Sequence, residues 1–204
     1  MRGRLVVLEG GEACGKSTQA GLLAPRLGAV LTREPGGTEI GERLRDLVLD
    51  PASAVLDART EALLMAAARA QHVAEVVRPA LAAGRDVVSD RFVGSSLAYQ
   101  GYGRGLPVGD VAALSRFATA GVDPDVVVLL DLAPTQALAR RDPRPDRLEA
   151  AGADFHRRVA EGFAALAEVD ARWVVVDAAG EPDAVAERVW AAVSARLRPC
   201  PTWV

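Results

Sequence analysis

The chain has 204 residues, of which 50% are apolar and 4% aromatic, and its formal net charge at pH 7 is −3. This length suits one α/β domain, at 1–197, followed by a flexible tail at 198–204. A slightly negative charge without a basic stripe argues against a nucleic-acid surface. The first residues lack a signal-peptide pattern and no apolar run is long enough to span a bilayer, so a cytoplasmic protein is expected.

Short runs rich in valine and leucine alternate along the chain with segments of helical period. The runs lack strict apolar–polar alternation, which is typical of strands buried on both faces. The predicted strands are 4–9, 29–33, 86–89, 125–132 and 173–176. The predicted helices are 18–27, 38–49, 57–83, 108–120, 134–141, 154–170 and 182–197. This order predicts an α/β fold, a five-stranded parallel sheet with helices on both faces.

A glycine-rich loop follows the first predicted strand and has the spacing of a phosphate-binding P-loop. Its glycines let backbone N–H groups wrap an anion, and the next helix presents the positive end of its dipole. Lys16, the only lysine in the chain, can bridge the β- and γ-phosphates, and the Ser17 hydroxyl can hold Mg²⁺. The predicted nucleotide-binding residues are Gly10, Gly11, Glu12, Ala13, Cys14, Gly15, Lys16, Ser17 and Thr18.

Polar clusters also follow other predicted strands, and the carboxyl ends of parallel strands meet at the edge that carries the P-loop. Asp90, after the third strand, can hold Mg²⁺, and Arg91 can bridge two phosphates with its planar fork. The alternative interpretation of this pair is a helix-capping aspartate beside a solvated arginine.

Four arginines and two prolines lie within 140–147, where the prolines prevent a regular helix. Arginines this close repel one another and need an anion or flexibility. Since Ala13 gives the P-loop no second cation, we expect a mobile lid at about 140–150 that closes over a triphosphate. Arg141, Arg144 and Arg147 are its candidate catalytic residues, with an exposed charged loop as the alternative.

The ordered set of motifs resembles that of bacterial thymidylate kinases over nearly the whole chain, from position 5 to about 197. The motifs are EGGEACGKST at 9–18, TREPGGT at 32–38, DRF at 90–92, SSLAYQG at 95–101, DRLE at 146–149 and FHRRV at 155–159. The resemblance implies the three-layer sandwich and lid of P-loop nucleoside-monophosphate kinases. It also implies a homodimer that transfers a phosphoryl group from ATP to dTMP with Mg²⁺.

The same resemblance assigns residues to the two substrates. Lys16 and the loop backbone would hold the ATP phosphates, and Glu12 would help to place the sugar 3′-hydroxyl of dTMP. The phosphate of dTMP would be bound by Arg45 and Arg91. Residues implied around the deoxyribose and thymine are Glu34, Pro35, Met65, Arg69, Ser96, Tyr99 and Gln100.

Two of these residues have distinct consequences. Tyr99 would fill the space that a ribose 2′-hydroxyl needs. Met65 replaces the phenylalanine that usually stacks on thymine in this family, so the base contact has less area and more flexibility.

No general base is expected, because the attacking phosphate oxygen of dTMP is already ionised at neutral pH. We therefore expect His72 and His156 on helix surfaces. A GTPase would need an Asn-Lys-x-Asp motif, and the chain contains no asparagine. Two alternatives stay open: a kinase for another nucleotide or deoxynucleoside, and a non-catalytic nucleotide-binding regulator.

Overall fold

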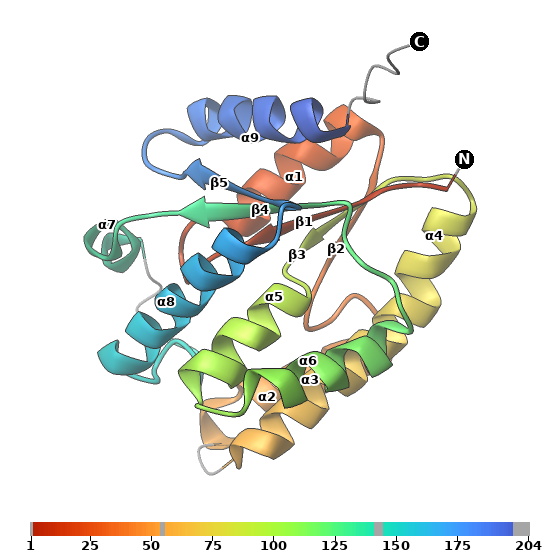
Figure 1. Ribbon diagram of the computed structural model, residues 1–204. Coiled ribbons are helices and arrows are strands. Elements are labelled where there is room, and N and C mark those ends of the chain that lie inside the picture. The colour runs from red at the N-terminus through yellow and green to blue at the C-terminus, as the bar shows by residue number, and fades with distance from the viewer. Residues whose placement is uncertain (1, 54–55, 141–144, 198–204) are drawn as a thin grey trace.

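Five parallel strands form the centre of the protein, in the order β2-β3-β1-β4-β5 (Figure 1). The structure is a computed structural model that describes residues 2–53, 56–140 and 145–197. The strands are β1 (Leu5–Glu9), β2 (Val30–Arg33), β3 (Val87–Asp90), β4 (Val126–Asp131) and β5 (Trp173–Asp177). All five predicted strands are confirmed, with ends that differ by one residue at most.

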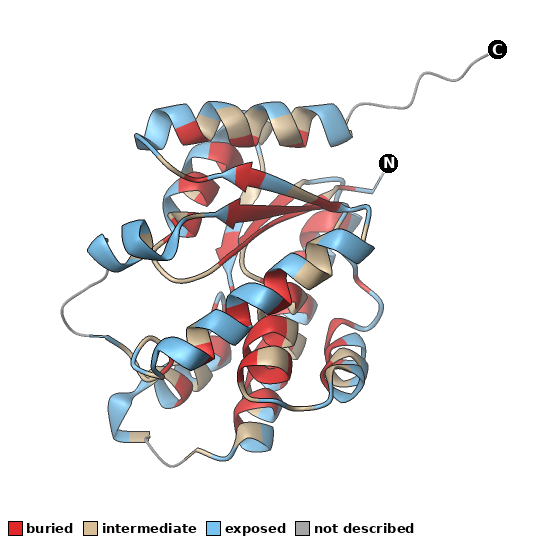
Figure 2. Cartoon of the chain, turned by 60° about the vertical axis from the view of Figure 1, so that its left-hand side comes forward, coloured by how far each residue is buried: buried red, intermediate tan, exposed pale blue. Residues whose placement is uncertain are grey.

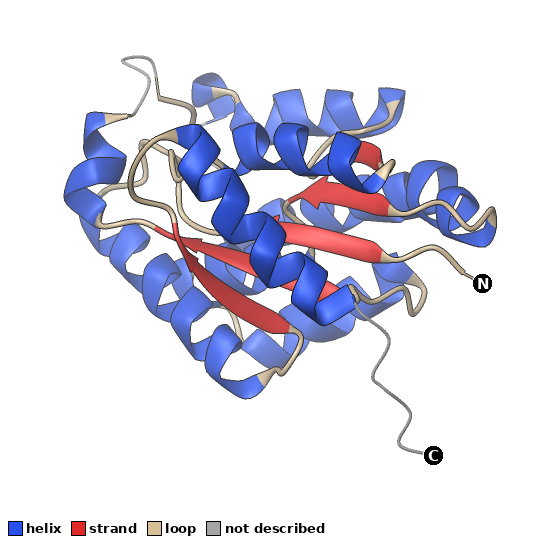
Figure 3. Ribbon diagram, turned by 90° about the horizontal axis from the view of Figure 1, so that it is seen from above, coloured by secondary structure: helices blue, strands red, loops and turns tan. Residues whose placement is uncertain are grey.

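Helices cover both faces of this sheet, so the predicted three-layer arrangement is confirmed (Figures 1 and 3). One face carries α1 (Lys16–Leu27) and α9 (Pro182–Leu197). The opposite side carries α2 (Glu39–Leu49), α3 (Ala58–His72), α4 (Arg78–Ala82), α5 (Val93–Ser96), α6 (Val108–Thr119) and α8 (Ala153–Val169). Short α7 (Pro134–Ala139) follows β4 at the carboxyl edge of the sheet, and a 3₁₀ turn, η1 (Pro51–Ser53), follows α2.

Successive residues of a strand pack into two separate hydrophobic cores, one on each face of the sheet. Leu5 and Val7 pack on the side of α3 and α8, whereas Val6 and Leu8 pack against α1 and α9. Figure 2 shows the strands buried along most of their length and the helices buried in stripes that face the sheet. The strands lack polar alternation because both of their faces are covered.

Two helical runs bear on the site. The predicted helix at 57–83 is confirmed as one continuous run, but a π-helical turn, η2 (Val73–Val77), separates α3 from α4. A second run was not predicted: α5 continues into the π-helical segment η3 (Leu97–Gly103). Helical segments of this kind are often found at functional sites.

The chain reverses its direction of winding at β1, which lies between β3 and β4. At such a switch point the loops after neighbouring strands diverge and leave a crevice at their carboxyl ends. The loops after β1, β2 and β3 all reach this edge. Within the described ranges, no helix is both long and apolar enough to cross a membrane.

Candidate active site

The P-loop connects β1 to α1 in the shape that its glycines allow. Gly10 has a φ of 143°, and a Cβ there would lie 2.7 Å from the carbonyl oxygen of Leu130. Gly15, with a φ of 92°, precedes α1, and no side chain of the described residues caps that helix. Its first N–H groups are therefore available to an anion. The Lys16 side chain is buried and donates to the Gly11 carbonyl oxygen at 2.6 Å.

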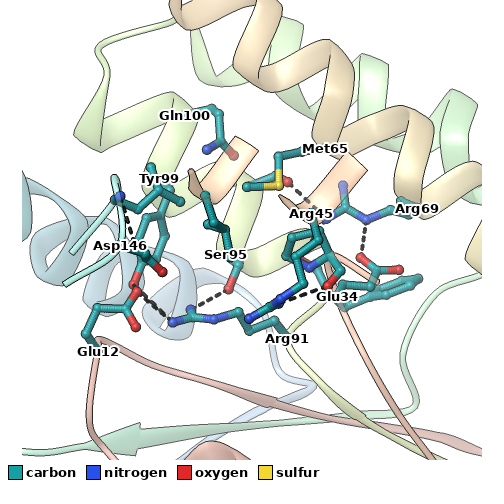
Figure 4. Close-up of a pocket in the computed structure, with 15 residues that line it drawn as sticks. Glu12, Glu34, Arg45, Met65, Arg69, Arg91, Ser95, Tyr99, Gln100 and Asp146 are labelled. Carbon is teal, nitrogen blue, oxygen red and sulfur yellow. Dashed lines mark hydrogen bonds and ion pairs between the residues drawn. The ribbon is translucent and has the colours of Figure 1, made fainter. Parts of the chain in front are cut away.

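Arg91 and Glu12 form an ion pair where the loops after β1 and β3 meet (Figure 4). The Arg91 guanidinium donates to Glu12 Oε1 at 2.8 Å and to Ser95 Oγ at 3.0 Å. It also lies 5.0 Å from the centre of the Tyr99 ring, whose hydroxyl donates to the same Glu12 oxygen. Burial alone would raise the pKa of Glu12, but the charges of Arg91 and Lys16 outweigh it and lower the pKa to about 2. Glu12 is therefore a carboxylate at neutral pH.

A second cation, Arg45 of α2, faces the same space. Its guanidinium is part-buried and donates to the Pro35 carbonyl oxygen at 2.9 Å. Burial, and then repulsion from Arg33 and Arg91, lower the pKa of Arg45. Arg45 has no ion pair with any described residue, so a bound anion would relieve this repulsion.

A buried network forms another wall of the site. Arg69 donates from Nε to Glu34 Oε2 at 2.7 Å and from its guanidinium to Ser96 Oγ at 2.9 Å. The other Glu34 oxygen lies 2.8 Å from His72 Nδ1, and His72 Nε2 lies 2.7 Å from Thr32 Oγ1. The prediction that His72 lies on a helix surface is wrong: its side chain is fully buried because both ring nitrogens have partners inside the protein. His156 is half-buried.

Glu12, Arg91, Arg45, Glu34 and Arg69 border one pocket of about 570 Å³, counting its open part. Figure 4 shows Glu12 and Arg91 at one end of it and Met65 and Gln100 at the other. The structure thus brings together all the residues that the resemblance assigned to the acceptor. The lining consists of Glu12, Glu34, Pro35, Arg45, Leu49, Met65, Arg69, Arg91, Phe92, Ser95, Ser96, Tyr99, Gln100, Asp146 and Leu148.

A second pocket lies over the P-loop and is joined to the first. It is lined by 12–19, by Asp90 and by Arg140, among others. The two pockets share five lining residues, Glu12, Glu34, Arg45, Arg91 and Asp146. Two anionic ligands, one in each pocket, would therefore meet at the Glu12–Arg91 pair.

The side chains of Ser17 and Asp90 fit a magnesium ion. Ser17 Oγ donates to Asp90 Oδ2 at 2.5 Å, while Asp90 Oδ1 is buried and has no hydrogen-bond partner among the described residues. A buried carboxylate oxygen without a partner suits a hard cation. No group of three or more His, Cys, Asp or Glu side chains in the described ranges is placed to hold a metal. The ion would therefore complete its shell with water and phosphate oxygens.

Of the three arginines expected to act from the lid, the structure describes only Arg147. Arg141 and Arg144 lie outside the described residues. Arg147, contrary to the expectation, turns away from the P-loop: it donates to the Val48 carbonyl oxygen at 2.7 Å and to Glu61 Oε2 at 2.6 Å. Its side chain is only 8% exposed, and its charge is paired with that of fully buried Glu61.

Sequence reasoning missed the role of Glu9, the last residue of β1. Its carboxylate is fully buried and accepts from the backbone N–H groups of Phe92 and Ser95, both at 3.0 Å, and from Ser95 Oγ at 2.5 Å. Glu9 thereby holds the start of α5, which carries several pocket residues. The feature of the sequence that could have revealed this role is a single carboxylate at the end of an otherwise apolar strand.

The family model described as Thymidylate kinase matches residues 8–189 of the chain. A thymidylate kinase of Desulforudis audaxviator is 49% identical, with 100% of this chain and 96% of that protein covered. One of a Synechococcus strain is 50% identical, with 94% and 96% covered. Among solved structures, thymidylate kinase from Ehrlichia chaffeensis superposes with a TM-score of 0.79 at 28% identity, covering 95% of this chain and all of that one.

Proposed function

The chain belongs to the thymidylate kinase family and is a phosphotransferase that converts dTMP to dTDP with ATP, and we propose that the two substrates meet at the Glu12–Arg91 pair. The observation that carries this assignment is the junction of two pockets. One lies over a P-loop, and the other is a cleft lined by both polar and apolar side chains.

On the donor side, the P-loop amides and Lys16 would bind the ATP phosphates. Lys16 Nζ is held by a carbonyl oxygen of its own loop and can exchange this contact for phosphate oxygens. Ser17 and Asp90 would hold Mg²⁺, which neutralises charge on the phosphates when it is bound.

On the acceptor side, Arg45 and Arg91 would bind the phosphate of dTMP. Arg45 brings a positive charge that no described carboxylate pairs with, whereas Arg91 is already oriented by Glu12. The deoxyribose would lie beside Tyr99, which would leave no room for a 2′-hydroxyl. The ionised Glu12 can accept a hydrogen bond from the 3′-hydroxyl.

The base would lie at the far end of the pocket. Met65 would contact its face, and Arg69, Ser96 and Gln100 would reach its edge. Arg69 is held by Glu34 before any ligand arrives, so its donors need little reorganisation.

No side chain needs to remove a proton in this reaction. The attacking oxygen belongs to a phosphate that is ionised at neutral pH, so catalysis consists of alignment and of offsetting repulsion between two anions. Lys16 and Arg91 would supply part of the positive charge that offsets this repulsion. Arg141 and Arg144 of the proposed lid would supply the rest.

A homodimer and a cytoplasmic location stay predictions. Two large apolar side chains, Leu63 of α3 and Phe117 of α6, are 57% and 86% exposed, and these helices pack against each other. Such a surface suits contact with a second copy. Light scattering on the purified protein would test it, with Phe117→Ser as the variant expected to weaken the dimer.

A coupled ADP-release assay tests the function directly. ATP and Mg²⁺ are supplied with dTMP, dUMP, UMP, dCMP, AMP or thymidine as the acceptor. We expect fast turnover with dTMP, slower turnover with dUMP and negligible turnover with the others. Faster turnover with a different acceptor would refute the pocket assignment, and nucleotide binding without any turnover would favour a regulator.

A further inference from the structure

Glu61 of α3 is a fully buried carboxylate that the mechanism above does not use. It lies behind the pocket wall and accepts hydrogen bonds from three side chains. Gln100 Nε2 donates to its Oε1 at 2.8 Å, and the guanidinium groups of Arg104 and Arg147 donate to its Oε2 at 3.0 and 2.6 Å. Only Gln100, of these three partners, lines the pocket.

The carboxylate is held in place and kept ionised by its two cations. Burial alone would raise the pKa of Glu61, but the hydrogen bonds from Arg104, Gln100 and Arg147 outweigh it and lower the pKa. Arg104 lies 4.5 Å from the centre of the Phe155 ring, and Arg147 is anchored on a carbonyl oxygen of α2. Glu61 therefore presents a fixed acceptor to Gln100.

This acceptor decides which way the Gln100 amide points. An ionised carboxylate accepts hydrogen bonds and donates none, so only the NH₂ group of Gln100 can face Glu61. The amide oxygen is then left on the other side. Within the described part of the chain, no donor reaches Gln100 Oε1, although the residue itself is 1% exposed.

We propose that Glu61 is a positioning residue that fixes the Gln100 amide so that the pocket selects the imide edge of thymine over the amino edge of cytosine. Thymine presents an N3–H donor, which a fixed amide oxygen can accept. Cytosine presents an unprotonated N3, so two acceptors would face each other there. This inference rests on the proposed function, because it requires that Gln100 faces the base.

The first test is Glu61→Gln. A neutral amide at this position can donate as well as accept, so both orientations of Gln100 become accessible. We expect KM for dTMP to rise about tenfold and the preference for dTMP over dCMP in kcat/KM to fall by about the same factor. KM for ATP should stay within about twofold, because the P-loop is untouched.

The matched control is Asp86→Asn, which breaks another part-buried pair, with Arg4 at 2.5 Å, at the amino end of β3. It should lower stability without changing KM for dTMP or the preference for dTMP over dCMP. If Glu61→Gln gives the same kinetic constants as this control, the positioning role is refuted.

Glu61→Gln leaves Arg104 and Arg147 without a counter-charge and could fail to fold. A second variant, Glu61→Asp, covers that case. Glu61→Asp keeps the charge but withdraws the oxygens from Gln100, and it should also raise KM for dTMP. An unchanged KM and base preference in soluble Glu61→Asp would overturn the proposal.

A double variant asks whether the effect passes through Gln100. Glu61→Asp combined with Gln100→Ala should show the base preference of Gln100→Ala alone. Multiplied effects on the preference would contradict the inference while leaving the proposed function intact. Failure of the unmodified enzyme to phosphorylate dTMP would refute both.

Discussion

The buried carboxyl of Glu9 links pH to stability in a way that one substitution can test. Burial raises its pKa from about 4.5 to about 7, although Ser95 and the charge of Arg91 act in the opposite direction. In Glu9→Gln, the amide oxygen can still accept from Phe92 and Ser95 N–H, and the NH₂ group can donate to Ser95 Oγ. The variant therefore imitates the protonated form and removes the titration.

The sign follows from which state holds the proton more tightly. The folded pKa lies above the unfolded one, so protonation of Glu9 stabilises the fold. This contribution is fully present below pH 4.5 and is lost as the pH rises through 7. Integrated between pH 5 and 8, it amounts to about 2.5 kcal/mol of unfolding free energy.

The assay is urea unfolding without nucleotide at pH 5, 6, 7 and 8, at one protein concentration. The unfolding free energy of Glu9→Gln minus that of the unmodified protein should rise by about 2.5 kcal/mol across this range. Groups that titrate in both proteins cancel in the difference. Glu187→Gln, which removes an exposed partner of Arg26, is the control and should give a flat difference. A flat difference for Glu9→Gln as well would show that Glu9 is ionised throughout and refute the reasoning.

Three further predictions concern the site. Lys16→Ala should fold with an unchanged melting temperature but lose about a hundredfold to a thousandfold in kcat, measured by ADP release, and near-normal turnover would contradict the phosphate role. Met65→Phe should keep kcat and lower KM for dTMP about two- to tenfold through added ring contact, whereas a raised KM would show that the base lies elsewhere. His72→Phe should lower the unfolding free energy, measured in urea, by about 2 kcal/mol, because Glu34 and Thr32 lose a buried partner. An unchanged midpoint of the urea transition would show that this network contributes little to stability.

The parts of the fold that were predictable from sequence are those encoded locally. The P-loop is a contiguous pattern, and its glycines are required by the backbone of that same loop. The strands were visible because a run buried on both faces must be apolar at every position. Long helices were found because the apolar residues on their buried face recur with a regular helical period.

The helical run through α5 and η3 was not predictable in this way. It contains Gly101 and Gly103, which disfavour helix, and its start is held by Glu9, 83 residues before Phe92 in the chain. A Cβ at Gly103 would lie 2.7 Å from the Phe155 ring of α8, so this glycine serves close packing and not a turn. Tertiary contacts, absent from any local window, decide this segment.

His72 and Arg147 failed for a related reason. Each is a polar residue that a local reading of the sequence places in solvent. Each is buried beside a carboxylate from elsewhere in the chain, with which it forms a hydrogen bond. The Glu34 carboxylate pairs with His72, and the Glu61 carboxylate accepts a hydrogen bond from Arg147. A sequence shows which residues carry charge, whereas pairing between distant charges depends on the packing of α2, α3 and the loop after β2.

In the proposed acceptor pocket, three arginines would divide the work of binding between preorganised donors and net charge. Arg69 and Arg91 are each held by a carboxylate, Glu34 and Glu12, so their donors are oriented before a ligand arrives and their net charge is largely offset. Arg45 donates to a backbone carbonyl oxygen and forms no direct ion pair with a described residue, so Glu42 and Asp146 attract its charge only from a distance. Under the proposed function, preorganisation would therefore serve the base and the reaction centre, whereas attraction for the anion would depend mainly on Arg45. An acceptor with a phosphate would thus be favoured over a nucleoside before any contact with the base is made.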